Sequence, residues 1–246
     1  MSGWSRPERL GPIIAGLAGL GWFFAELAPQ SYGFNDTDDP SVGLAFVAAH
    51  PTAWALAGDL FLVMSIALIV AVIATRSRLT AGAAPGSTRS DVVVDSVTVV
   101  GLLSAAFLFG HGMVRQAGGP MLHVEGLDVA WGEAAYLVTQ FAGIHLFAVS
   151  GITLLSMWIV AAAWLGVRRG VVPVWLAILA VLPGARLLAP LGPWSLVPEG
   201  LWIFFFASIP TASLWLVLLG VSSVDTLADR TVRATRAPEP AEAIAT

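Results

Sequence analysis

The sequence contains no cysteine and no lysine, and each absence excludes a kind of chemistry. Without cysteine the chain has no disulfide, no thiolate metal site, no iron–sulfur cluster and no thiol nucleophile. Without lysine it has no amine that could form a Schiff base with retinal or a substrate, and its 12 positive charges are all arginine. A chain rich in Ala, Gly, Val and Leu that uses arginine alone is typical of a GC-rich bacterial genome.

Charge of either sign is scarce, whereas long apolar segments are plentiful. Charged residues make up 11% of the 246 residues, against about 25% in a soluble domain. Hydrophobic residues make up 57%, and the mean hydropathy is +0.82. Together with a net charge of −4, this composition excludes a soluble enzyme, a disordered chain and a nucleic-acid-binding protein. It predicts an integral membrane protein.

Six segments have the length and apolar character of a membrane-spanning helix, which needs about 20 residues. We expect these spans at residues 10–28, 52–75, 92–114, 134–166, 171–191 and 200–221. The predicted fold is therefore all-α, a polytopic membrane protein with six transmembrane helices in one bundle over residues 1–224. The segment 225–246 is rich in Ala, Pro, Glu and Arg, and we expect it to form a disordered cytoplasmic tail.

Three of the expected spans have features that predict irregular helices. The fourth is longer than a hydrocarbon core of about 30 Å requires, so we expect it to tilt, protrude, or break near Gly143 or Gly151. Pro183 in the fifth span predicts a kink, as does Pro210 in the sixth.

The placement of arginine predicts the orientation, because positive charges are enriched in cytoplasmic loops. All but two of the 12 arginines flank the expected spans on the side that also holds both termini. The opposite side carries only Arg115 and Arg186, and its loops are acidic. We therefore expect a multi-pass protein of the bacterial cytoplasmic membrane with both termini in the cytoplasm.

Small residues recur every fourth position on two of the expected spans. Gly11, Ala15 and Gly19 form such a stripe on the first, and Gly101 and Ala105 on the third. Such stripes let a second helix approach closely. The partner is either another helix of the same chain or a second copy.

The candidate functional residues are the polar groups inside the expected spans. Such groups are costly in a bilayer and usually face the bundle interior or water. The candidates for a ligand or proton site are Glu26, Asp59, His111, Gln140, His145 and Arg186. All of them lie toward the outer leaflet, and this one-sided clustering predicts a polar cavity that opens to the outside.

Two structural explanations compete with a ligand site. Glu26, Arg115 and Glu199 lie near enough to a span end to reach the interface by extending their side chains. The deeper groups could form an internal ion-pair network. For Arg186 we expect an inward orientation and an ion pair, with Asp59 as the first choice of partner and Glu26 as the second.

No catalytic, nucleotide or metal-binding motif occurs in the sequence, which lacks a Walker loop, HExxH and GxSxG. His111 and His145 form the one pair whose depth would let two helices clamp a haem iron. His50, which precedes Pro51, is expected in a loop or at a helix start, and His123 in a loop. Because no second pair or haem attachment motif accompanies them, we expect no cofactor and no metal.

Four apolar stretches, taken in order, carry the pattern of this chain. The first span reads GPIIAGLAGLGWFFAEL, and the second is entered through FVAAHPTAWALAGDLFLVMSIALIV. The later half carries FAGIHLFAVSGITLLSMWIV, followed by the basic turn RRGVVPVWLAILAVLPGARLL. In these stretches the chain resembles a large group of uncharacterised bacterial six-span membrane proteins that are catalogued as a domain of unknown function. The resemblance implies the six-span fold and places Asp59 and His145 where that group carries polar span residues; it implies no activity.

The expected function is a non-enzymatic one. We expect the protein to bind a lipid-like or small apolar ligand, or a partner protein, through the outward-facing polar cavity. The alternatives are an intramembrane enzyme or haem-linked redox protein, and a small proton-coupled transporter. The expected partners are membrane lipids and either another protein or a second copy of the chain, with no nucleic acid.

Overall fold

The computed structural model describes residues 6–34, 39–81, 88–121, 129–188 and 202–235, and within these ranges it is helical with no strand. The α-helices are α1 (Arg6–Glu26), α2 (Ala28–Ser31), α3 (Pro40–Ala49), α4 (Pro51–Ala81), α5 (Thr88–Met121), α6 (Val129–Gln140), α7 (Val149–Arg168), α8 (Val174–Leu179), α9 (Val181–Gly184) and α10 (Trp202–Thr235). A π-helix, η1 (Phe141–Ala148), joins α6 to α7, and a 3-10 helix, η2 (Ala185–Leu188), follows α9. The all-α prediction is confirmed.

Four helical segments of the described chain are long and apolar enough to cross a membrane. They are Pro51–Ala81, Val92–Gly118, Val129–Arg168 and Ile203–Ser222. The expected spans at 10–28 and 171–191 are not among the four. The first has a charged residue near each end, Arg9 and Glu26, and the second is divided into α8, α9 and η2.

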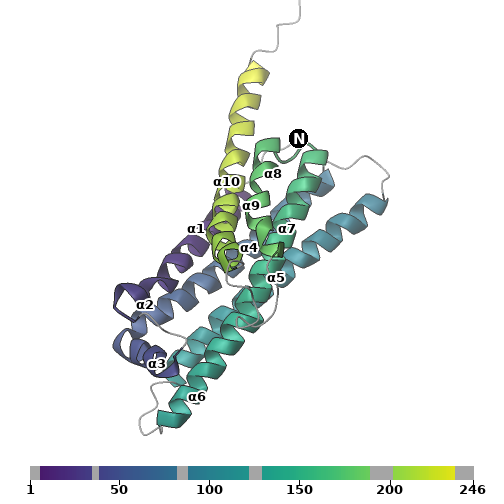
Figure 1. Ribbon diagram of the computed structural model, residues 1–246. Helices are drawn as coiled ribbons and strands as arrows, with labels where there is room; N and C mark the ends of the chain where they lie inside the picture. The colour runs from purple at the N-terminus through teal and green to yellow at the C-terminus, as the bar shows by residue number, and fades with distance from the viewer. Residues whose placement is uncertain (1–5, 35–38, 82–87, 122–128, 189–201, 236–246) are drawn as a thin grey trace, which may run out of the picture.

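The long helices lie side by side in one bundle (Figure 1). Helix α4 packs between α1 and α5, α7 packs on α5, and α10 packs on α1. The interior is apolar and includes Trp158 of α7 and Trp215 of α10, whose ring centroids lie 6.1 Å apart in an edge-on arrangement. The indole Nε1 of Trp215 donates a hydrogen bond of 2.9 Å to the carbonyl of Leu176, which fastens α8 to α10.

The small-residue stripes pack against helices of the same chain. Gly11 faces Val70 of α4, and Gly101 faces Trp158 of α7. The closest approach of a described glycine to the backbone of another helix involves Gly16 of α1, where an added Cβ would lie 2.3 Å from the backbone oxygen of Ser213 in α10. Of the two alternatives for the stripes, packing within the chain is therefore confirmed.

Helix α3 lies in the segment that the sequence analysis expects to be an outer loop, between residues 30 and 51. Asp39 caps its first turn, because Asp39 Oδ1 accepts a 2.8 Å hydrogen bond from the amide of Ser41. Pro40 occupies the first helical position, where its missing amide hydrogen costs nothing. Helices α2, α3 and the start of α6 gather at one end of the bundle (Figure 1).

The expected fourth span is one continuous helical run from Val129 to Arg168, and it breaks neither at Gly143 nor at Gly151. Its irregularity is the π-helix η1, where the amide of Val149 bonds to the carbonyl of Ile144, five residues earlier. A π-turn admits one extra residue without ending the helix. The side chains after it are therefore rotated about the helix axis relative to those before it.

A tight turn reverses the chain after α7. The amide of Val171 bonds to the carbonyl of Gly166 at 2.8 Å, and that of Gly170 bonds to Val167 at 3.0 Å. This pair is the Schellman pattern, which needs a left-handed residue; Gly170 supplies it with φ of +66°. Pro173 then prevents the helix from resuming at once, and α8 returns along α7.

Helix α10 is longer than the expected sixth span. It is continuous through Pro210 and ends at Thr235. It therefore extends beyond residue 221 into the segment 225–246 that the sequence analysis expects to be disordered. The last part of that segment, 236–246, lies outside the described residues.

Candidate functional site

The structure pairs Glu26 of α1 with Arg115 of α5. Arg115 donates from both terminal nitrogens to the two carboxylate oxygens of Glu26, and the Nη2–Oε2 bond measures 3.2 Å. Trp22 donates from Nε1 to the same carboxylate at 2.9 Å. The guanidinium of Arg115 also lies 4.3 Å from the ring centre of Trp54. The Arg115 side chain is only 7% exposed, so aromatic rings shield this ion pair from water.

Asp59 lies on an exposed face of α4 and has a different partner from the one expected. Its Oδ1 accepts a 2.6 Å hydrogen bond from Nε2 of Gln116, which also donates to the carbonyl of Ala55 at 3.0 Å. Asp59 and Glu26 are thus engaged by side chains of α5. The expectation that either acid pairs with Arg186 is wrong.

Arg186 lies in η2, apart from the other candidates, and its predicted inward orientation is confirmed. It is 1% exposed, and its guanidinium lies 5.3 Å from the ring centre of Phe205 in α10. The broken helix after Pro183 places it there, since an unbroken α8 would carry residue 186 to another face of the bundle.

His111 is buried against the π-helix. Its Nδ1 lies 2.6 Å from the carbonyl oxygen of Gly143, and its ring packs on Phe61 with centroids 4.2 Å apart. A carbonyl only accepts, so Nδ1 carries the hydrogen and Nε2 presents a lone pair. Nε2 is buried and has no hydrogen-bond partner among the described residues.

The remaining candidates lie on or beside η1. Gln140 ends α6 and donates from Nε2 to the hydroxyl of Tyr136 at 2.8 Å. The backbone of His145 belongs to η1, but its side chain lies outside the described structure, as do His123 and Glu199. Among the side chains that are described, no group of three or more His, Asp or Glu residues could hold a metal ion.

A chain of ring contacts joins the candidates near α5 and occupies the space between them. Trp22 bridges Glu26 to Phe61, with the two rings 4.4 Å apart, and Phe61 in turn contacts His111. The structure therefore brings Glu26 and His111 into one packed cluster with Arg115. It leaves Asp59 at the edge of this cluster and Arg186 outside it.

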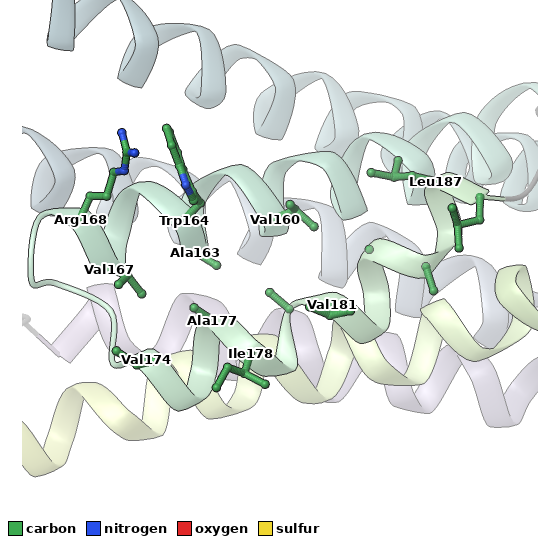
Figure 2. A pocket seen from close by; sticks show the side chains of 14 residues that line it. Val160, Ala163, Trp164, Val167, Arg168, Val174, Ala177, Ile178, Val181 and Leu187 are labelled. Carbon is green, nitrogen blue, oxygen red and sulfur yellow. The ribbon is translucent and has the colours of Figure 1, made fainter.

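A cavity of about 730 Å³ lies elsewhere, between α7 and the returning segment of α8, α9 and η2. We call it the α7–α9 groove. Its lining consists of apolar side chains, Trp164 and one charged residue, Arg168. Figure 2 shows Arg168 at one end of the groove and Leu187 toward the other. The volume falls in the range of about 300–1,000 Å³ that small-molecule sites occupy.

The groove exists because the helix beside α7 is irregular and carries small side chains. Residues Ala163, Ala177, Ala180 and Gly184 line it and leave space that larger side chains would fill. Gly184 approaches α7 closely, since a Cβ on it would lie 2.8 Å from Val160. The returning segment thus touches α7 there and leaves room on either side.

Arg168 and Arg169 end α7 together but have different surroundings. Arg169 donates from Nη1 to the carbonyl of Leu79, which ties the turn to α4. Arg168 is exposed, and its guanidinium lies 4.1 Å from the ring centre of Trp164. In the described part of the chain no acidic group lies within salt-bridge distance of Arg168. Its charge is therefore not neutralised by a described acid at this end of the groove.

The groove is not among the sites predicted from the sequence, because those candidates are polar residues and the groove is lined by apolar ones. The signal that could have found it is the run of small residues around the Pro183–Gly184 step. No protein-family model, curated protein or solved structure matches this chain. The resemblance to the six-span membrane proteins stays a prediction, and the function must be argued from the geometry.

Proposed function

We propose that this protein is a non-enzymatic membrane protein that binds a lipid-like ligand in the α7–α9 groove. The observation that carries the proposal is an apolar groove of about 730 Å³ with a single charge, Arg168, at one end. A molecule that is apolar along most of its length and polar at one tip fits this distribution. The proposal places the ligand in this groove instead of the outward-facing polar cavity, because the two acids among the candidates of that region, Glu26 and Asp59, are engaged by Arg115 and Gln116.

The proposed topology has six crossings, with both termini in the cytoplasm of a bacterial membrane. Helix α1 has 21 residues and is roughly 31 Å long, so it matches a core of about 30 Å. The segment Val174–Leu188 would be only roughly 22 Å long even if it were regular. We infer that this segment belongs to the fifth crossing.

The distribution of arginine along the bundle supports this orientation. Gly220 of α10 lies against the backbone of Arg9, and Arg76 of α4 pairs with Asp95 of α5 at 2.8 Å. The end of α4, the α7–α8 turn and the later part of α10 lie at the end of the bundle opposite α2 and α3 (Figure 1). Arg168 and Arg169 belong to that same turn, as the positive-inside rule requires of a cytoplasmic end.

Cysteine labelling tests the orientation, because the chain has no cysteine of its own. Gln30→Cys and Ala81→Cys place thiols at exposed positions on opposite ends of the bundle. In intact cells a membrane-impermeant maleimide should label the Gln30→Cys protein and leave the Ala81→Cys protein unlabelled until the cells are opened. The reverse pattern, or equal labelling, would contradict the proposed orientation.

Native mass spectrometry of the full chain, extracted gently in mild detergent, tests lipid binding. We expect a stoichiometric lipid that Val160→Trp removes, because Val160 lines the groove and an indole would fill it. Met157→Trp is the matched control, since Met157 is exposed on the same helix and does not line the groove. Equal occupancy in both variants would place the lipid elsewhere and reject the groove.

A further inference from the structure

We infer that the lipid in the α7–α9 groove is an anionic phospholipid, with its phosphate at Arg168 and one acyl chain along α7. This inference rests on the proposed function and names the class of ligand. It follows from three properties of the groove: its single charge, the apolar character of the rest of its lining, and the position of that charge at one end.

The single charge selects the headgroup. Among the described residues that line the groove, Arg168 alone is charged, and no described acid lies within salt-bridge distance of it. A guanidinium presents parallel N–H donors that match two oxygens of a phosphate. The guanidinium also makes a cation–π contact with Trp164, 4.1 Å from the ring centre.

The apolar remainder selects the tail. Beyond Arg168 the lining offers no charged side chain, and Val160, Ile178 and Leu187 lie along the groove away from it (Figure 2). A soluble phosphate compound would leave this surface unused, and an uncharged hydrocarbon would leave Arg168 without a partner. A phospholipid satisfies both ends of the groove with one molecule.

The net charge of the lipid follows from the surroundings of the headgroup. Arg168 lines this end of the groove, whereas the guanidinium of Arg169 donates to the carbonyl of Leu79 in α4 and does not line it. A zwitterionic headgroup would bring its own cation near Arg168, whereas an anionic headgroup would not. Each arginine near a membrane surface favours anionic lipid by about 1 kcal/mol, which corresponds to roughly a fivefold preference. Anionic lipids are also abundant on the cytoplasmic leaflet, the side on which the proposed topology places Arg168.

Competition between two lipids with the same acyl chains tests the inference. The full chain is placed in nanodiscs of equal parts phosphatidylglycerol and phosphatidylcholine, extracted, and the bound lipid is measured by native mass spectrometry. We expect roughly a fivefold excess of phosphatidylglycerol in the bound fraction. Arg168→Gln should bring the ratio close to one while lipid remains bound, and Arg168→Lys should retain part of the excess.

Arg76→Gln is the control for general surface charge, because Arg76 lies at the same end of the bundle and pairs with Asp95 outside the groove. It should keep the excess. An equal drop in Arg76→Gln and Arg168→Gln would overturn the inference, as would a ratio near one in the unaltered protein. Lipid bound in the groove without a preference would leave the proposed function standing. If the Val160→Trp and Met157→Trp proteins bind the same amount of lipid, the groove is not the lipid site. The proposed function is then rejected, and the inference about the headgroup with it.

Discussion

His111 and Gly143 join α5 to the π-helix η1, with 2.6 Å between the imidazole Nδ1 and the carbonyl oxygen. In a π-turn the hydrogen bonds run five residues back, as the bond from Val149 to Ile144 does, and the α-helical pattern is interrupted. A carbonyl at such an interruption needs a donor from elsewhere when water is excluded. His111 supplies that donor to Gly143 from the neighbouring helix.

Replacing His111 should loosen η1 according to whether the donor is kept. We predict that His111→Leu lowers stability by about 1–2 kcal/mol, because it leaves the Gly143 carbonyl unsatisfied in an apolar interior. Hydrogen exchange of the amides in Phe141–Ala148 should speed up in this variant. His111→Asn places an amide N–H near the position of Nδ1 and should protect these amides better than leucine does. Equal exchange in the two variants would contradict the role assigned to Nδ1.

Removing only one partner of the Glu26–Arg115 ion pair should lower the stability of the protein by leaving the other charge unpaired, and the double replacement should avoid part of that loss. Arg115→Met leaves a carboxylate that is 27% exposed without its cation, and we predict a loss of about 2 kcal/mol after allowance for that exposure. Glu26→Gln with Arg115→Met should lose less than the sum of the single variants, with a coupling of about 1 kcal/mol. Thermal unfolding in detergent measures all three variants. Strictly additive losses would show that the pair contributes nothing as a pair.

Two glycines of α1 should respond in opposite ways to alanine. Gly16→Ala would force a Cβ to 2.3 Å from the Ser213 oxygen, so α10 must shift, and we predict a loss of about 1–3 kcal/mol. Gly21→Ala meets only the end of the Leu60 side chain at 3.3 Å. Its effect should lie between zero and a gain of about 1 kcal/mol, because alanine favours helix. A similar loss in both variants, measured by thermal unfolding, would argue against the close contact of α1 with α10.

The cap of α3 should depend on pH through Asp39. Hydrogen bonds from the hydroxyl and the amide of Ser41 hold the pKa of Asp39 below its ordinary value of 3.8. A depressed folded pKa means that the stabilisation is complete above pH 3.8 and is lost as pH falls through the folded value. We predict that protection of the α3 amides, corrected for intrinsic exchange, declines only below about pH 4.

Asp39→Asn is the control for this titration, since asparagine caps a helix without an ionisable group. Its α3 protection should be independent of pH over the same window. Asp39→Ala should show weak protection at every pH. A decline in Asp39→Asn as large as in the unaltered protein would assign the effect to another acid.

The long helices could be predicted because their signal is local and repeated. Pro51–Ala81 contains an apolar stretch long enough to cross a membrane, and in such a setting a single segment satisfies its backbone hydrogen bonds by forming a helix. Helix α3 was missed because Pro40–Ala49 is too short to span a membrane, although Asp39 followed by Pro40 is an ordinary helix-start signal. Because the helix is shorter than a span, a search for membrane-spanning segments assigns residues 30–51 to a loop despite this signal.

Partners could not be predicted, because they depend on how each helix is rotated. The positions of Arg186 and Asp59 along their helices favour a contact between them. Position along a helix does not show toward which neighbouring helix a side chain points. The break around Pro183 and the π-turn at Phe141–Ala148 set the rotation of two segments. Neither the rotation nor the π-turn has a reliable local signature. The groove is apolar, so the polar candidates do not indicate it; its one local signal is the run of small residues around Pro183 and Gly184.

Helix α10 continues from Ser222, where its membrane-length part ends, to Thr235, and this extension projects past the other helices (Figure 1). The extension is roughly 20 Å long. Isolated helices shorter than about 12–15 residues are marginal in water, because few hydrogen bonds offset the entropy of nucleation. The bundle therefore serves as the nucleus from which this extension propagates. Its helix–coil equilibrium lies close to balance, so temperature, ionic strength or an adjoining surface can shift it at an energy too small to disturb the rest of the fold.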